Sequence, residues 1–288
     1  MCYNVFSNSA RAKTRRKKFE QNRAQTNKER REKMRKSVKI FGIGNSFSVD
    51  AMEWVYKILK NLGVEEIKLG NLYIGGCPLR LHCENARGDL PAYEYWTNTD
   101  DEWKIIPDFK MSDAIVEREW DYVFTQQQSG RSGLADTYDD VDELMAYVKG
   151  LVKGNPTYGW QMTWAYANYF ENPNFEPYDN DQDKMYAAIL NAVQTKILPR
   201  KEFERLIPSG TAIQNARAVL GDTLNRDGFH LSYDLGRFIA GLCVVKGLIG
   251  LDIDNVTYAP EGVDEEKRAL AIAAANAACK TPFSVTKI

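Results

Sequence analysis

Two short polar motifs, far apart in the chain, contain residue types that could carry out acyl-transfer chemistry. The first is Gly-Asn-Ser at 44–46, which follows the apolar run 38–43 and precedes a helical pattern. A serine at a junction between a strand and a helix can present both its amide and its hydroxyl to a ligand, so Ser46 is a candidate nucleophile. An ordinary turn or helix-capping serine has the same local sequence, and this motif alone leaves both interpretations open.

The second motif is Asp-Gly-Phe-His at 227–230, directly before a long apolar helical pattern. An aspartate three residues before a histidine can hydrogen-bond the imidazole Nδ1 and so leave Nε2 free to act as a base. The alternative is a helix N-terminus at which Asp227 caps the helix and His230 only packs. The chain has 2 histidines, His82 and His230, so any imidazole chemistry must use one of them.

Other catalytic and cofactor-binding patterns do not occur in the sequence. It contains no G-x-G-x-x-G or G-x-x-x-x-G-K-[ST] nucleotide motif and no G-x-S-x-G serine elbow. The 5 cysteines form no C-x-x-C pair and 2 histidines are too few for a histidine-rich metal centre, so we expect neither a metal site nor a disulfide framework. Since no run of about 18 apolar residues occurs, no membrane-spanning helix is expected.

The elements that must position these motifs alternate between strands and helices. Five apolar runs predict strands, at 38–43, 66–74, 121–125, 157–164 and 203–207. Helical patterns occupy 51–62, 112–119, 141–152, 181–197, 211–220, 231–249 and 265–279. Such alternation predicts an α/β fold, a three-layer α/β/α sandwich around a five-stranded parallel sheet.

Small and polar residues follow four of the predicted strands. They are Gly-Asn-Ser at 44–46, Gly-Gly-Cys at 75–77, Gln-Gln-Gln-Ser-Gly at 126–130 and Ser-Gly at 209–210. Ligands of parallel α/β sheets bind beyond the carboxyl ends of the strands. We therefore expect these four segments to build one site.

The distribution of charge divides the chain into two parts. Residues 1–36 contain 13 Lys and Arg against 3 Glu, a balance of +10, and since the whole chain carries −1, residues 37–288 carry −11. The first part has too few aliphatic residues to fold by itself, which predicts a disordered or helical basic arm that fold and catalysis do not need. The second part is predicted to be one domain, and its acidity argues against nucleic acid as a partner.

Taken together, the motifs resemble the SGNH (GDSL-like) hydrolase superfamily from residue 39 to about residue 251. The first block of that family matches residues 41–48, the glycine block matches 71–77, and the last block matches 227–230. More narrowly, Gly-Asn-Ser-Phe-Ser, Ile-Pro-Ser-Gly-Thr-Ala-Ile-Gln-Asn-Ala and Asp-Gly-Phe-His-Leu-Ser are similar to a mostly uncharacterised gut-bacterial branch near the carbohydrate acetylesterases. The resemblance implies a flavodoxin-like SGNH hydrolase fold over residues 37–288.

The resemblance also implies a catalytic triad. Ser46 would be the nucleophile, His230 its base, and Asp227 the residue that orients the histidine. Chemistry of this kind needs no metal and no organic cofactor, so none is expected.

An oxyanion hole is implied as well, with one departure from the family. The backbone N–H groups of Ser46 and Gly76 would donate to the oxyanion. The third block of the family usually adds an asparagine, whereas this chain has glutamines at 126–128. A glutamine amide offers the same kind of donor, and because adjacent residues at a strand end point in opposite directions, Gln127 or Gln128 would fill the role.

Four further residues are weaker candidates for contacts with the substrate: Asn45, His82, Trp96 and Trp164. Aromatic faces suit sugar rings, and Trp96 lies in a long insertion between the second and third predicted strands. Three of these residues, all except Asn45, also have a purely structural interpretation. His82 would then belong to a helix, Trp96 would pack under a loop, and Trp164 would lie in the core.

The function predicted from the sequence is serine ester hydrolysis that removes acetyl groups from carbohydrates. The alternative enzyme is a lipase or thioesterase on acyl chains, and the alternative without catalysis is an inactive carbohydrate-binding protein on the same fold. The expected partner is a small-molecule or polysaccharide ester, and the sequence indicates no oligomeric state. With no secretory signal pattern, a cytoplasmic location is the default expectation, and export stays open if the native N-terminus differs.

Overall fold

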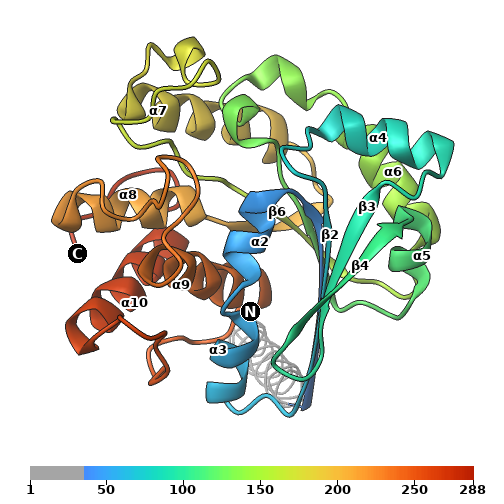
Figure 1. Ribbon diagram of the computed structural model, residues 1–288, viewed down its shortest axis with the longest axis horizontal. Coiled ribbons are helices and arrows are strands. Elements are labelled where there is room, and N and C mark those ends of the chain that lie inside the picture. The colour runs from blue at the N-terminus through green and yellow to red at the C-terminus, as the bar shows by residue number, and fades with distance from the viewer. Residues whose placement is uncertain (1–35) are drawn as a thin grey trace, which may run out of the picture.

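The computed structural model describes residues 36–288, and seven strands of this part form a single sheet (Figure 1). Along the sheet the strands follow the order β4-β3-β2-β1-β5-β6-β7. Their bounds are β1 Ser37–Gly44, β2 Glu66–Tyr73, β3 Tyr93–Asn98, β4 Trp103–Phe109, β5 Tyr122–Thr125, β6 Thr157–Gln161 and β7 Phe203–Ile207. Residues 1–35 lie outside the described residues, so the basic arm and the domain boundary at 36 stay predictions.

Five of the strands are parallel and place the polar segments of the sequence at one edge of the sheet. β1 pairs in parallel with β2 and β5, and parallel pairing continues from β5 to β6 and from β6 to β7. These strands overlap the five predicted ones, although the fourth ends at Gln161 and not at 164. Their order is doubly wound, with β2 on one side of β1 and with β5, β6 and β7 on the other. The segments that follow β1, β2 and β5 therefore come together beyond the carboxyl ends.

The sheet has seven strands, so the prediction of a five-stranded sheet is wrong. Residues 93–109 form a hairpin in which β3 pairs antiparallel with β2, and β4 pairs antiparallel with β3. Most of β4 is exposed to solvent, and Ile105 is 50% exposed. A strand with little buried face has no clear alternation of apolar and polar residues, so the hairpin looks like an insertion in the sequence.

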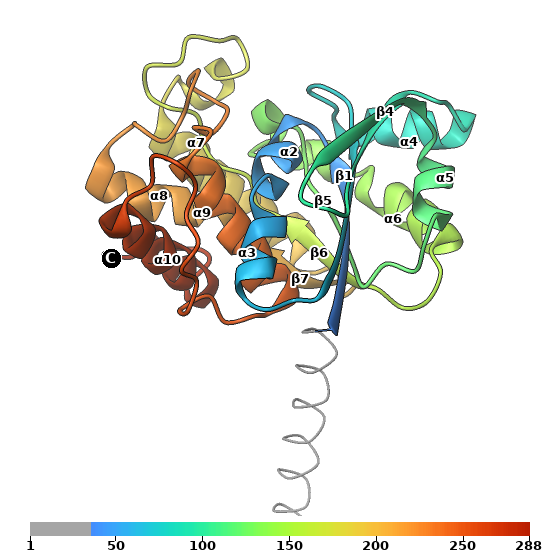
Figure 2. The same ribbon diagram turned by 60° about the horizontal axis from the view of Figure 1, so that its bottom comes forward.

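Helices cover both faces of the sheet (Figure 2). Their bounds are α2 Ser46–Met52, α3 Val55–Asn61, α4 Leu79–Gly88, α5 Met111–Val116, α6 Val141–Leu151, α7 Gln182–Ala192, α8 Ser209–Leu220, α9 Leu235–Cys243 and α10 Glu265–Lys280. On one face lie α4, α5 and α6, and on the other lie α2, α3 and α9, with α8 and α10 packed against α9. This is the predicted α/β/α arrangement. No helix in the described part of the chain is long and apolar enough to cross a membrane.

The core is built around β1, which lies in the middle of the sheet. Ile40, Phe41 and Ile43 are all buried, because helices cover both faces of this strand. Phe41 also stacks on Trp120, with ring centroids 4.9 Å apart. Burial on both faces explains why this strand has a continuous apolar sequence, and it gives the segment that follows β1 a rigid support.

Candidate active site

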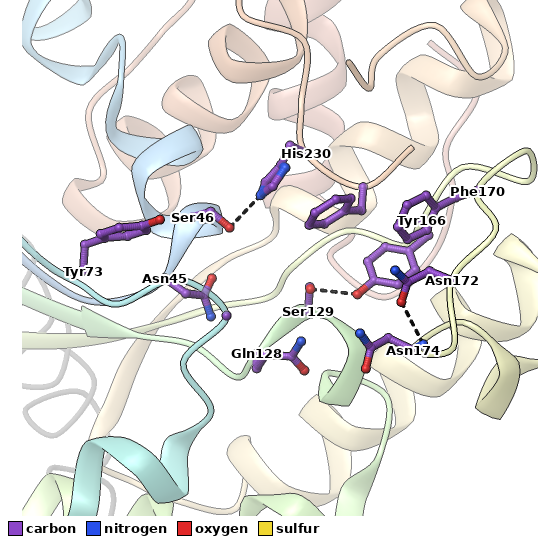
Figure 3. A pocket seen from close by; sticks show the side chains of 13 residues that line it. Asn45, Ser46, Tyr73, Gln128, Ser129, Tyr166, Phe170, Asn172, Asn174 and His230 are labelled. Atoms are coloured by element: carbon purple, nitrogen blue, oxygen red, sulfur yellow. Dashed lines mark hydrogen bonds between the residues drawn. The ribbon is translucent and has the colours of Figure 1, made fainter. Parts of the chain in front are cut away.

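Three side chains from two distant segments meet beyond the carboxyl end of β1, and Figure 3 shows two of them, Ser46 and His230. Ser46 is the first residue of α2, and its Oγ lies 2.8 Å from Nε2 of His230. Nδ1 of the same ring lies 2.6 Å from Oδ2 of Asp227. The structure thus brings the three residues of the predicted triad into one chain of hydrogen bonds, in the order that a serine nucleophile requires.

A tight turn in the loop between α8 and α9 sets the orientation of the histidine. Oδ1 of Asp227 accepts hydrogen bonds from the backbone N–H of His230 at 2.7 Å and of Phe229 at 3.2 Å. Gly228 suits this turn because its φ is +88°, and because a Cβ at this position would lie 2.6 Å from the ring of Phe170. One carboxylate therefore fixes both the backbone and the ring of His230.

The Asp227 carboxyl is stabilised in its charged form. Burial by itself disfavours ionisation, but hydrogen bonds from the ring and backbone of His230 and from the N–H of Phe229 outweigh it, so the pKa of Asp227 lies below its ordinary value. Asp227 is therefore a carboxylate in neutral solution. It can stabilise a positive charge that forms on the imidazole during proton transfer.

Asn45 holds three strand ends together at the base of the site. Its Oδ1 accepts hydrogen bonds from the N–H of Phe47 at 3.0 Å and from Nε2 of Gln126 at 2.7 Å. Its Nδ2 donates to the carbonyl of Cys77 at 3.1 Å. Asn45 borders the pocket, as predicted for a substrate contact, but its amide is engaged within the protein and caps the helix that begins at Ser46.

Two backbone N–H groups are free beside the nucleophile. Ser46 and Gly76 both line the pocket, and no hydrogen bond within residues 36–288 uses either N–H. Gly76 has a φ of +63°, and nothing lies within 4 Å of the position that a Cβ would occupy. Free backbone N–H groups next to a nucleophile are suitable donors to an oxyanion.

The two glutamines predicted as oxyanion donors point in different directions. Nε2 of Gln127 donates to the carbonyl of Thr137 at 2.6 Å, and its Oε1 accepts from the N–H of Leu79 at 3.1 Å. Gln128 lines the pocket, and its Oε1 accepts from the N–H of Arg131 at 3.0 Å. Figure 3 shows the Gln128 amide at the pocket surface. The structure thus leaves Gln128 as the candidate donor, because the Gln127 amide is engaged in the fold.

A cavity of about 330 Å³ lies beside the Ser46 hydroxyl. This volume is near the lower end of the roughly 300–1,000 Å³ typical of small-molecule sites. One side is formed by the segments after β1 and β2, and the other by residues 162–181 between β6 and α7, which we call the wall loop. The lining residues are Asn45, Ser46, Tyr73, Gly75, Gly76, Gln128, Ser129, Tyr166, Phe170, Asn172, Asn174, Phe229 and His230.

The wall loop supplies four lining residues that sequence reasoning missed, namely Tyr166, Phe170, Asn172 and Asn174. The Tyr166 hydroxyl lies 2.8 Å from Oγ of Ser129, and the Phe170 ring stacks on Phe229 with centroids 5.0 Å apart. The available signal was position, because this loop follows the carboxyl end of β6, where ligands of such sheets bind. Its sequence of scattered aromatic and amide residues matches no catalytic motif.

Three residues predicted as weak substrate contacts do not line the pocket. His82 is fully buried on α4, and burial lowers its pKa to about 3. Trp164 is also fully buried, because it stacks on Phe47 with centroids 4.1 Å apart and donates its indole N–H to the carbonyl of Phe229. Trp96 lies on β3 against Tyr73, a pocket residue, with centroids 5.6 Å apart. The structure therefore gives the first two an interior position and places the third one residue away from the pocket.

Metal binding has no visible basis in the part of the chain that the structure describes. Within residues 36–288, no group of three or more His, Cys, Asp or Glu side chains is placed to hold a metal ion. The buried thiol of Cys77, near Gly76, has a pKa raised to about 12 by burial, so it is not a thiolate at neutral pH.

The family comparison covers most of the chain. Residues 39–278 match a family described as a domain of unknown function, DUF4886. The crystal structure of a DUF4886 family protein from Bacteroides uniformis is 36% identical in sequence, with a TM-score of 0.84 and coverage of 88% of this chain and 98% of that one. No curated protein matches the chain.

More distant structural neighbours include hydrolases. A proposed SGNH hydrolase from Slackia heliotrinireducens is 16% identical, with a TM-score of 0.44 and coverage of 73% of this chain and 98% of that one. The acetylxylan esterase Axe2 from Geobacillus stearothermophilus is 12% identical, with a TM-score of 0.49 and coverage of 76% and 98%. SGNH hydrolases and acetylxylan esterases are thus among the neighbours of the chain, as the sequence resemblance predicted.

Proposed function

This chain belongs to the DUF4886 family, a domain of unknown function, and we propose that it is a serine ester hydrolase that removes acetyl groups from carbohydrate substrates. The observation that carries the proposal is the continuous hydrogen-bonded chain from Ser46 Oγ through the His230 ring to Asp227. The alternative considered from the sequence, in which Asp227 caps a helix and His230 only packs, does not require a serine hydroxyl on Nε2 and a carboxylate on Nδ1. Such an arrangement suits general-base activation of the serine.

In the first half of the reaction, Ser46 attacks the ester carbonyl. His230 Nε2 takes the hydroxyl proton as the bond between Oγ and the carbonyl carbon forms, and Asp227 stabilises the imidazolium. The tetrahedral intermediate then collapses to an acyl-serine. The alcohol leaves with the proton that Nε2 returns to it.

In the second half, water repeats the sequence. His230 Nε2 takes a proton from water as the water oxygen attacks the acyl-serine carbonyl, and the second tetrahedral intermediate collapses with release of the acid. The proton on Nε2 returns to Ser46 Oγ. The enzyme is then restored with no net change in its protonation.

The oxyanion of each intermediate is stabilised by three N–H donors. Two are the backbone N–H groups of Ser46 and Gly76, which have no partner within the described residues. The third is the Gln128 amide at the pocket surface. Fixed donors of this kind act where charge develops, and each typically contributes about 10²–10³ in kcat.

The composition of the pocket supports a sugar as the alcohol part of the ester. Asn172 and Asn174 place amide groups on the wall opposite Ser46, and Tyr73 and Phe170 add aromatic rings. Amide groups can exchange hydrogen bonds with hydroxyls, and aromatic rings can pack on the apolar faces of a sugar. An extended acyl chain would instead need a continuous apolar wall, so this composition favours a short acyl group over the lipase or thioesterase alternative.

The first test is an ester panel together with covalent labelling. Wild-type protein should hydrolyse p-nitrophenyl acetate faster than p-nitrophenyl esters of eight or more carbons, and should release acetate from acetylated xylo-oligosaccharides. A serine-reactive phosphonate should add its mass to the peptide that contains Ser46. The Ser46→Ala variant should lose both labelling and hydrolysis.

The matched control is Ser129→Ala, since Ser129 is a second serine of the same pocket. This variant should still be labelled and should still hydrolyse p-nitrophenyl acetate. Labelling at Ser129 instead of Ser46 would overturn the assigned nucleophile. A wild type that binds acetylated sugars without labelling or hydrolysis would instead favour the inactive carbohydrate-binding protein.

A further inference from the structure

A fully buried carboxylate, Asp50, lies one helical turn after Ser46 on α2. Its Oδ2 accepts a hydrogen bond of 2.9 Å from the N–H of Leu231, the residue directly after His230. The neighbouring N–H, that of His230 itself, donates to Asp227. Two carboxylates therefore hold two consecutive amides of the histidine loop, and one of those carboxylates belongs to the helix of the nucleophile.

Two guanidinium groups complete the surroundings of Asp50. Nη1 of Arg226 lies 3.1 Å and 3.2 Å from its two carboxylate oxygens, and Nε of Arg237 lies 2.8 Å from Oδ1. Arg237 also donates from Nη1 to Oε2 of Glu53, the residue that follows α2, at 3.1 Å. A buried charge is tolerated when it is paired and hydrogen-bonded in this way, and removal of one partner leaves the others uncompensated.

The geometry of this cluster joins the three segments on which the triad depends. Asp50 lies on α2, Arg226 lies in the histidine loop, and Arg237 lies on α9. Arg226 also donates to the carbonyl of Leu231, so both polar groups of that residue are held. Asp50 forms no hydrogen bond with Ser46 Oγ or with the His230 ring. Its link to the histidine is the backbone N–H of Leu231.

We propose that Asp50 is a positioning residue that, with Arg226 and Arg237, holds His230 Nε2 at hydrogen-bond distance from Ser46 Oγ. This inference rests on the proposed function of Ser46 and His230. A displacement of about 1 Å between reacting groups can cost on the order of 10²-fold in rate. The wall loop, which forms the opposite side of the pocket, contains none of these three residues. Loss of the cluster should therefore lower kcat and kcat/KM together and leave KM nearly unchanged.

The test compares Asp50→Asn with a control variant, Arg200→Gln, which breaks the ion pair between Arg200 and Asp142, neither of which lines the pocket or contacts the Asp50 cluster. We expect Asp50→Asn to lower kcat on p-nitrophenyl acetate by tenfold to 100-fold, with KM within twofold of wild type. The phosphonate labelling rate of Ser46 should fall in parallel. Arg200→Gln should keep wild-type kcat, and thermal unfolding should show both variants folded at the assay temperature.

A milder variant keeps the inference testable if Asp50→Asn does not fold. Arg237→Lys retains the charge but loses one arm of the guanidinium fork, so a three- to tenfold fall in kcat with unchanged KM is expected. A folded Asp50→Asn or Arg237→Lys protein with wild-type kcat and labelling rate overturns the inference and leaves the proposed function intact. A wild type that is not labelled at Ser46 overturns the proposed function, and the inference with it.

Discussion

The two histidines of the chain occupy opposite environments on the two sides of the sheet. His82 is fully buried on α4, its Nδ1 lies 3.0 Å from the Tyr93 hydroxyl, and its Nε2 has no partner within the described residues. His230 lies at the pocket, and both of its ring nitrogens have partners, a carboxylate on one side and a hydroxyl on the other. The side chains are identical, so the surroundings decide what each can do.

The contrast shows which surroundings allow acid–base chemistry. Burial lowers the pKa of His82 to about 3, because no carboxylate compensates the charged form, and the ring stays neutral. His230 has Asp227 beside it, and hydrogen bonds keep that carboxyl ionised. A nearby fixed charge and access to the pocket are therefore what His230 has and His82 lacks, and neither property can be read from the identity of the residue.

The largest expected effect comes from replacing each of the two histidines separately by glutamine. His230→Gln should lower kcat on p-nitrophenyl acetate by a factor on the order of 10⁴ or more, since Ser46 loses its base. His82→Gln should leave kcat within about twofold, because His82 does not line the pocket and its hydrogen-bond partner Tyr93 does not line it either. Steady-state kinetics on folded protein, verified by circular dichroism, measures both. A folded His82→Gln protein without activity would break the comparison.

The two glutamines after β5 extend the comparison to a second residue type. Gln128→Ala should lower kcat by about 10²–10³, or roughly 2.7–4 kcal/mol, because it removes a donor to the oxyanion. Gln127→Ala should keep kcat near wild type but lower the free energy of unfolding by about 1–3 kcal/mol, since the groups that it bonds are left unsatisfied. Kinetics and urea unfolding of the two variants separate the roles. The opposite result would make Gln127 the donor.

The buried histidine should make stability depend on pH. Below pH 6.5 the unfolded chain takes up a proton on His82, whereas the folded protein does not until about pH 3, so protons favour the unfolded state in this window. The part of the free energy of unfolding that depends on His82 is fully present above pH 6.5. It falls by at most about 1.4 kcal/mol for each pH unit between pH 6.5 and about pH 3. Urea unfolding at pH 7 and pH 5 should show a smaller loss in His82→Gln than in wild type. An equal loss in both would place the acid sensitivity elsewhere.

The smallest effect concerns Asn174 of the wall loop, which is exposed at the pocket, unlike the buried Asn45. Asn174→Ala should raise KM for acetylated xylo-oligosaccharides about three- to tenfold, because one neutral hydrogen bond contributes roughly 1 kcal/mol. Its kinetics on p-nitrophenyl acetate should not change, since that substrate carries no sugar. Equal losses on both substrates would mean that Asn174 shapes the site instead of contacting the sugar.

The parallel sheet and the location of the site could be predicted because both follow from local patterns. The strands β1 and β5 in the middle of the sheet are buried along most of their length and so have largely apolar sequences, and four of the five predicted strands are followed by small or polar residues. The motif at 44–46 and the motif at 227–230 come from opposite ends of the domain. The second motif follows α8 and not a strand, so strand topology alone does not place it beside Ser46. Their pairing was inferred from the resemblance to the SGNH hydrolases.

The remaining features depend on tertiary contacts that no local pattern encodes. The hairpin 93–109 joins the sheet through pairing with β2, and β4 has too little buried surface to produce an alternating pattern. The choice between Gln127 and Gln128 depends on Thr137, ten residues away, which engages the first of them. The role of Asp50 depends on the amide of Leu231, 181 residues further along the chain.

The way in which the wall loop is attached has a consequence for directed evolution. Tyr166 and Phe175 anchor the middle of the wall loop in the core, and Phe170 packs on Gly228 and Phe229 beside His230. The residues at 171–174 lie between these anchors and are exposed or half-exposed. Under the proposed function, a saturation library confined to 171–174 would therefore vary substrate preference and tolerate many substitutions, whereas substitutions at Phe170 would displace His230 and lower the turnover of every substrate.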